Sequence, residues 1–277
     1  MGLPGSFIHQ SNTGHVFKDR TRGKIGSLDK YGLLTRPTHM QLIERFEKRP
    51  ALNAVIALDE NSNAAAHAAA QIANKDWEVL GTNMTTALCT YSTGGGIVLT
   101  TAGAASDQAI VTPHLDTNQS SWASGRFITT AADLYMSFWI RTGSAITTSV
   151  VWAGLKLTNT HVDTTDADQF YFRYENGVNS GKWQINTSRS NVDVNVDTGV
   201  TAALSTDYFL ELLIDANRLP TAWINGTQVL SPAISATGGA ALTTAITLIP
   251  YVGVFDNAGG SARAVRVRQI VAATLAA

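Results

Sequence analysis

Short segments with a period of two are the feature that most restricts how this chain can fold. Side chains of an extended strand alternate between its two faces, so the strict alternation in 133–143 predicts a strand with one apolar face. Segment 170–174 alternates in the same way and is followed by Asn176-Gly177, a pair typical of hairpin turns. Several such segments, separated by Gly, Asn and Asp, predict a mainly β chain folded as an antiparallel jelly-roll sandwich. In 133–143 the apolar face carries Leu134, Met136, Phe138 and Ile140, and the other carries Tyr135, Ser137, Trp139 and Arg141.

Three further segments fit a sandwich. Residues 208–214 form an apolar run interrupted only by Glu211, which predicts a strand covered on both faces. Near the C-terminus, two valines alternate with Arg266 and Arg268. Cys89 is the one cysteine, so no intramolecular disulfide can form, and its apolar surroundings predict a buried thiol in a strand.

The first fifty residues differ in charge from the rest of the chain. They hold nine Lys/Arg and four Asp/Glu, a net charge of +5, whereas the remaining 227 hold eleven and seventeen, a net charge of −6. Residues 1–36 show no period and contain six glycines, so we expect an extended arm. Alternate basic residues would form one edge of that arm, suited to an acidic groove or to phosphates. These expected partner-binding residues are Lys18, Arg20, Arg22 and Lys24.

One or two short helices are expected between the arm and the sandwich. Thr38 and Gln41 have capping-box spacing, and Pro50 would end a helix that begins after Pro37. The alanine-rich stretch 62–74 favours a second helix. The expected organisation is therefore an arm over 1–36, a helical linker over 37–75 and the sandwich over 76–277.

The sandwich region also resembles a known family. The segment Asp133–Gly143 is similar to the inner strand of concanavalin A/laminin G-like jelly rolls. The run Tyr208–Asp215, followed by Thr221–Val229 with its aromatic-x-Asn-Gly turn, resembles the later strand pair of that family. The resemblance covers about 76–277 and implies a concanavalin-like fold. A basic arm before such a domain also resembles structural proteins of tailed-bacteriophage particles.

Motifs that carry chemistry are sparse. The E-x-D-x-E strand of the glucanase branch is missing, and the glutamates after residue 50 are widely separated. The run Thr93–Gly96 lacks the lysine of a phosphate-binding loop and predicts a turn. Asp163, Asp166 and Asp168 would either bind Ca²⁺ or form an Asp/Thr-rich turn, and the turn is favoured. We expect no catalytic residue, no metal site and no cofactor.

Composition limits where the protein works and what it contacts. No run approaches 18 apolar residues, so no membrane span is expected, and the N-terminus lacks the pattern of a secretory signal. Charged residues make up 15% of the chain, below the roughly 25% usual for soluble domains. This fits a surface partly covered by neighbours in a homo-oligomer or larger assembly, and it fits equally a β-sandwich whose surface is made neutral by Thr, Ser and Asn. Nucleic acid is disfavoured as a partner because the basic excess is small.

These observations favour a virion structural protein, made in the host cytoplasm, that decorates a phage head. In this hypothesis the arm binds the major capsid protein or another virion protein. The alternative is a carbohydrate-binding module of a tail fibre or receptor-binding protein, with a glycan as its partner. A third hypothesis, a lyase or hydrolase on the same fold, is disfavoured, so the chain is expected not to be an enzyme.

Overall fold

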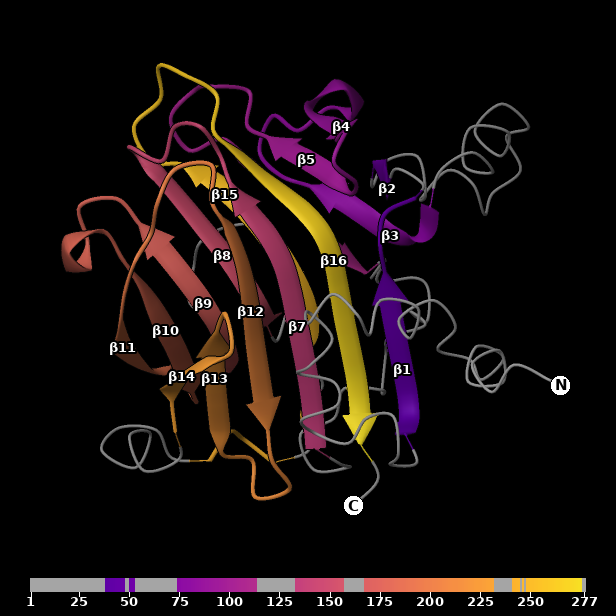
Figure 1. Cartoon of the computed structure of the whole chain (residues 1–277), viewed down its shortest axis with the longest axis vertical. Helices are drawn as coiled ribbons and strands as arrows, with labels where there is room; N and C mark the ends of the chain where they lie inside the picture. The colour runs from indigo at the N-terminus through magenta and orange to yellow at the C-terminus, as the bar shows by residue number, and fades with distance from the viewer. Residues whose placement is uncertain are drawn as a thin grey trace, which may run out of the picture.

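The structure is a sandwich of two β-sheets (Figure 1). It is a computed structural model, and it describes residues 38–47, 50–52, 74–113, 133–156, 167–231, 241–244, 246 and 248–275. Within these residues the helical elements are two single turns of 3-10 helix, Thr86–Leu88 and Asn179–Gly181. The predicted mainly β, antiparallel sandwich is confirmed.

The first sheet has the strand order β14-β13-β12-β7-β16-β5-β4, with β1 also paired to β16. Its strands β12, β7 and β16 run side by side at the front of Figure 1. The bounds are β1 Thr38–Glu44, β4 Cys89–Tyr91, β5 Ile97–Thr100, β7 Asp133–Thr142, β12 Asp207–Ile214, β13 Pro220–Ile224, β14 Thr227–Leu230 and β16 Ala264–Leu275.

The second sheet has the order β11-β10-β9-β8-β15-β6-β3-β2, and only its β2–β3 pair is parallel among the described strands. The hairpin predicted at Asn176-Gly177 is confirmed, since β9 and β10 pair antiparallel across it. The bounds are β2 Pro50–Leu52, β3 Asn74–Leu80, β6 Gln108–Pro113, β8 Ser149–Lys156, β9 Gln169–Glu175, β10 Lys182–Arg189, β11 Val192–Thr201 and β15 Ile249–Asp256.

The core lies between the two sheets and is built from the alternating positions that the sequence indicates. In β7 the four predicted apolar side chains are buried in this core. Trp183 of β10 packs against Tyr174 of β9 and Tyr208 of β12, with ring centroids 6.0 Å and 5.2 Å away, so aromatic rings link the two sheets. Burying one large apolar side chain contributes roughly 1.5–3 kcal/mol, so these rings stabilise the contact between the sheets. Cys89 is buried, as predicted.

The helix predicted between Pro37 and Pro50 is wrong. Residues 38–44 form strand β1, which pairs antiparallel with the C-terminal half of β16, and Pro50 begins β2. A capping box contributes only about 1 kcal/mol, and the backbone hydrogen bonds to β16 outweigh it. Phe46, which follows β1, is buried against Trp77, with ring centroids 5.5 Å apart. The predicted arm 1–36 and most of the second predicted helix lie outside the described residues.

Candidate functional site

The residues predicted to act lie mostly outside the described ranges. This is so for Lys18, Arg20, Arg22 and Lys24, and for Asp163 and Asp166. Asp168 is described and buried, and its Oδ1 accepts a hydrogen bond of 2.5 Å from the Thr243 hydroxyl, so it anchors a segment distant in sequence. Among the described residues no group of three or more His, Cys, Asp or Glu side chains is arranged to hold a metal ion. In the same part of the chain no helix is long and apolar enough to cross a membrane.

The outer face of the second sheet carries three aromatic side chains that are buried. Trp152, Tyr171 and Tyr251 lie on adjacent strands, and the Tyr251 ring centroid is 6.3 Å from that of Trp152 and 6.1 Å from that of Tyr171. Lys156 lies over the Tyr251 ring, and the Asn186 side chain donates to the Tyr171 hydroxyl. All three rings are at most 4% exposed, so a large ligand cannot reach them in this conformation.

The outer face of the first sheet carries charged side chains that solvent does reach. Arg141 of β7, Arg266 and Arg268 of β16, Asp207 of β12 and Trp139 of β7 come together there, and we call this set the arginine cluster. The side chains of Arg141, Asp207 and Arg268 are 36%, 28% and 20% exposed. Because this face is both charged and accessible, the arginine cluster is the candidate site.

Strand register brings the cluster together. Arg141 is directly opposite Asp207 on one side and Arg266 on the other, so three strands contribute to one row. A β-bulge between Val267 and Gln269 inserts Arg268 as an extra residue beside this row. Bulges commonly redirect side chains in this way. The valines beside these arginines are buried, so the predicted alternation in this part of β16 is confirmed.

The turn between β4 and β5 fits closely against the bulge. The predicted turn over 93–96 is confirmed, and the Gly95 carbonyl accepts a hydrogen bond of 3.1 Å from Arg266 Nε. Gly96 has a φ of +80°, and a Cβ there would lie 2.1 Å from the Val267 oxygen. Only glycine fits this approach, so the turn fixes both the bulge and one arginine of the cluster.

Two ion pairs and one stack order the cluster. Arg141 Nη1 is 2.9 Å and Arg268 Nη1 is 3.4 Å from the Asp207 carboxylate, so two arginines share one acid. The Arg268 guanidinium lies over the Trp139 ring with its Cζ 4.8 Å from the centroid, which is within cation–π range. These contacts hold Arg141 and Arg268 in defined orientations.

The electrostatic balance of the cluster is positive. Three guanidinium groups face one carboxylate among the described ion pairs, which leaves a formal charge of +2. Burial lowers the pKa of Arg266, the charge on Arg268 lowers it further, and Asp207 partly opposes this. Arg266 Nη2 and Arg268 Nε are buried and have no hydrogen-bond partner among the described residues. The excess positive charge of the partly exposed guanidinium groups therefore favours an anionic or hydroxyl-rich partner.

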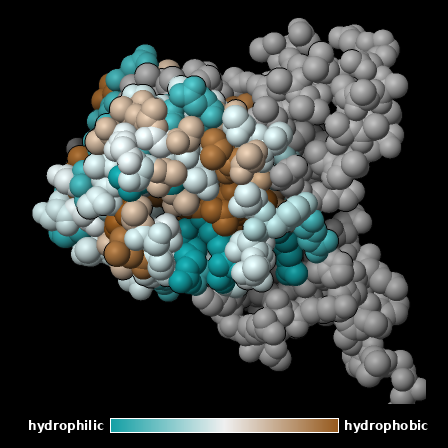
Figure 2. Space-filling view, turned by 90° about the horizontal axis from the view of Figure 1, so that it is seen from above, coloured by the Kyte–Doolittle hydropathy of each residue, from teal (hydrophilic) through white to brown (hydrophobic). Residues whose placement is uncertain are grey.

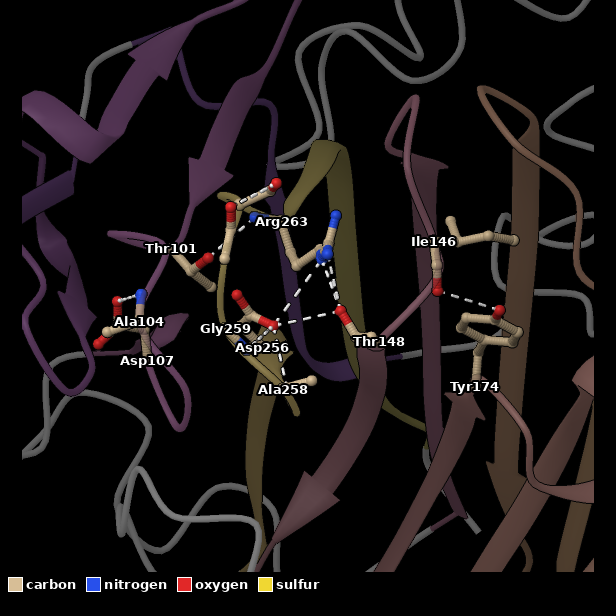
Figure 3. Close-up of polar contacts among 12 residues, drawn as sticks. Thr101, Ala104, Asp107, Ile146, Thr148, Tyr174, Asp256, Ala258, Gly259 and Arg263 are labelled. Carbon is tan, nitrogen blue, oxygen red and sulfur yellow. Dashed lines mark hydrogen bonds and ion pairs between the residues drawn. The ribbon is translucent and has the colours of Figure 1, made fainter.

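A buried clamp holds the end of the sandwich next to the cluster (Figure 3). The Asp256 carboxylate accepts hydrogen bonds from two backbone N–H groups of the loop that follows it, and its Oδ1 is 3.8 Å from Arg263 Nε. Arg263 also donates to the Thr148 hydroxyl at 2.7 Å and, through its backbone N–H, to Thr101 Oγ1 at 2.9 Å. These bonds fix the loop from which β16 starts, and so help to position its arginines.

Seen from this end, hydrophilic and hydrophobic residues are interspersed on the surface (Figure 2).

Sequence alternation alone placed Trp139 and Arg141 on one outward face and Arg266 and Arg268 on another. It did not indicate that these faces adjoin, nor that Asp207 joins them. A period of two assigns faces within a strand but leaves the order of strands open.

Comparisons with known proteins show the fold. No protein-family model matches the chain, and no curated protein matches its sequence. A protein of unknown function from Shewanella oneidensis MR-1 has a similar structure, with 11% identity, 89% of this chain and 94% of that chain covered, and a TM-score of 0.50. The Crh5 transglycosylase is similar over 86% of each chain, with 11% identity and a TM-score of 0.50. The alginate lyase AlgAT5 of polysaccharide lyase family 7 covers 73% of this chain and 95% of its own, with 10% identity and a TM-score of 0.47.

The fold is thus a concanavalin-like jelly roll, as the resemblance implied. The expectation that the chain is not an enzyme is contradicted, because an enzyme, the Crh5 transglycosylase, is among the similar structures. The missing glucanase motif argued against one enzyme class only, and the fold serves others. At this level of identity the likeness shows the fold and assigns no residue a role.

Proposed function

We propose that this protein binds carbohydrate on the outer face of its first sheet, at the arginine cluster. The observation that carries the proposal is the set of ordered and partly exposed guanidinium groups on that face. Fixed N–H donors suit the hydroxyl and acidic oxygens of a glycan, and a held donor loses less entropy on binding than a free one.

The surroundings of the cluster support the same ligand class. Phe209 of β12 is directly opposite Trp139 and is half-buried, so it offers apolar area beside the guanidinium groups. Asn225, exposed in the β13–β14 turn, accepts a hydrogen bond of 2.9 Å from the Phe209 backbone and brings a polar amide to the edge of this area. Apolar area ringed by a few oriented polar groups is the usual composition of a small-molecule or sugar site.

The fold adds support because the Crh5 transglycosylase, an enzyme that by its name acts on glycosyl groups, shares it. This proposal takes up the alternative from the sequence, a carbohydrate-binding module of a tail fibre or receptor-binding protein, in place of the capsid decoration that the sequence favoured. Capsid decoration, localisation in a virion and binding through Lys18, Arg20, Arg22 and Lys24 stay predictions, since these residues lie outside the described ranges. Homo-oligomer formation also stays a prediction.

The test is a glycan-array screen of the full chain, followed by calorimetric titration of each glycan that binds. We expect binding that Trp139→Ala weakens and that Tyr91→Ala, a change at an aromatic residue 56% exposed on β4, leaves unchanged. New reducing ends should be measured in the same samples, since the fold is also that of enzymes. Absence of binding across neutral and acidic glycans would contradict the proposal.

A further inference from the structure

The charge balance of the arginine cluster indicates which glycans would bind. Asp207 forms ion pairs with Arg141 and Arg268, and its charge also acts on Arg266, although no ion pair joins these two side chains among the described residues. Within the described residues Arg266 has no carboxylate partner, and its Nε bonds a neutral carbonyl, that of Gly95. Within the described part of the chain, the positive charges of the cluster therefore outnumber its one carboxylate.

Building three like charges into adjacent positions of a sheet is unfavourable without a compensating anion, because like charges directly opposite one another destabilise a strand pair. Arg141 and Arg266 are such a pair. The burial and like-charge contacts that lower the pKa of Arg266 reflect the same cost. An anion bound between these strands would remove it.

The shape of the cluster fits an oxyanion. A guanidinium presents its N–H groups in a planar fork that matches a carboxylate or sulfate, and charge-assisted hydrogen bonds of this kind are the strong ones. Asp207 and Trp139 fix Arg141 and Arg268, and the Gly95 carbonyl fixes Arg266. The donors are therefore in place before the ligand arrives.

We propose that the arginine cluster is an anion site that binds one carboxylate or sulfate group, and that the glycan bound by this protein is an acidic polysaccharide. This inference rests on the proposed carbohydrate binding at the same face. Arg266 is the residue that we expect to contact the acidic group, because within the described residues it forms no ion pair with a carboxylate. Arg141 and Arg268 would contribute the rest of the positive field.

The experiment compares one acidic oligosaccharide with the same oligosaccharide after reduction of its carboxylates to alcohols. Both are titrated calorimetrically into the full chain, together with a sulfated glycan, sodium sulfate alone and a single-stranded DNA oligonucleotide. The variants are Arg266→Gln, Arg268→Gln and the matched control Arg189→Gln, a change at an exposed arginine at the end of β10. Urea unfolding of each variant shows that it is folded.

We expect the acidic form to bind at least tenfold more tightly than the reduced form. Arg266→Gln should lower affinity for the acidic form about tenfold and leave the reduced form unchanged, and Arg189→Gln should change neither. Tighter binding of the sulfated glycan than of the carboxylate-bearing oligosaccharide would identify the acidic group as sulfate, in support of the anion site.

The other outcomes separate the two proposals. Equal affinity for the acidic and reduced forms would overturn the anion site but would leave the proposal of carbohydrate binding intact. Binding of sulfate alone, lost in Arg266→Gln, with no glycan bound would uphold an anion site and overturn carbohydrate binding. Tighter binding of the oligonucleotide than of any glycan would overturn the acidic-polysaccharide assignment, and absence of all binding would overturn both.

Discussion

Arg268 lies over the ring of Trp139, with its Cζ 4.8 Å from the ring centroid, and its Nη1 is also 3.4 Å from Asp207. One side chain is thus held by a stack and by an ion pair at once. The β-bulge that inserts Arg268 into β16 is what brings it into reach of both partners. The arginine cluster is therefore preorganised by the first sheet.

Arg268→Lys tests this preorganisation. Lysine keeps the positive charge but loses the planar fork and most of the stack, so affinity for an acidic glycan should fall about threefold to tenfold. Calorimetric titration measures the change, with Arg189→Lys as the control. Full affinity in Arg268→Lys would show that charge alone suffices and that the stack on Trp139 has no role in binding.

Gly96→Ala tests the fit of the β4–β5 turn against the bulge. A Cβ at Gly96 would overlap the Val267 oxygen at 2.1 Å, in addition to the strain of a φ of +80°. The free energy of unfolding should fall by about 2 kcal/mol or more. Gly226 is the matched control, because its φ is +81° and a Cβ there has nothing within 4 Å, so Gly226→Ala should cost only about 1 kcal/mol. Equal losses in urea unfolding would refute the close approach.

Arg263→Ala tests the clamp at the end of the sandwich. The side chain of Arg263 is 9% exposed and that of Asp256 is fully buried, so removing the arginine leaves a buried carboxylate without its cation. Breaking such a pair should lower the free energy of unfolding by about 3 kcal/mol. Lys182→Ala, which breaks the solvent-exposed pair with Asp197, should change stability little. If both variants unfold at the same urea concentration, the clamp does not stabilise the fold.

Tyr174 makes the stability of the folded protein depend on pH in the alkaline range. Burial raises the pKa of the Tyr174 phenol above its ordinary 10.0, and the nearby Tyr208 raises it further. A raised pKa in the folded state contributes stability that is complete below pH 10 and is lost as the pH rises through the folded-state pKa. The phenol donates to the Ile146 carbonyl at 3.2 Å, and that donor disappears on ionisation. The free energy of unfolding of the wild type, measured with urea, should fall above pH 10, and it should fall less in Tyr174→Phe. The same pH profile in both proteins would contradict the assignment.

Sequence reasoning was most successful where one strand carries its own signal. The alternation in β7 gave both of its faces, and the apolar run 208–214 predicted a strand there, which is β12. Glu211 within this run is buried, and its carboxylate accepts a hydrogen bond of 3.1 Å from the Tyr135 hydroxyl. Such patterns depend only on the pleat of a single strand.

It was least successful where distant segments meet. The helix signals around Thr38 are local, and pairing of β1 with β16 overrides them. The candidate site could not be predicted because Arg141 and Arg266 are 125 positions apart and become neighbours only through the order β12-β7-β16. The bulge at Arg268 has no sequence signature of its own.

The central claim, that ligand binds at the arginine cluster, is tested most directly by NMR of arginine side-chain N–H groups during titration of the full chain with an acidic oligosaccharide. The account predicts saturable shifts of the Nε–Hε signals of Arg141, Arg266 and Arg268, with those of Arg189 and Arg218 unchanged. Shifts confined to Arg173 on the second sheet, with the three cluster signals unmoved, would contradict it.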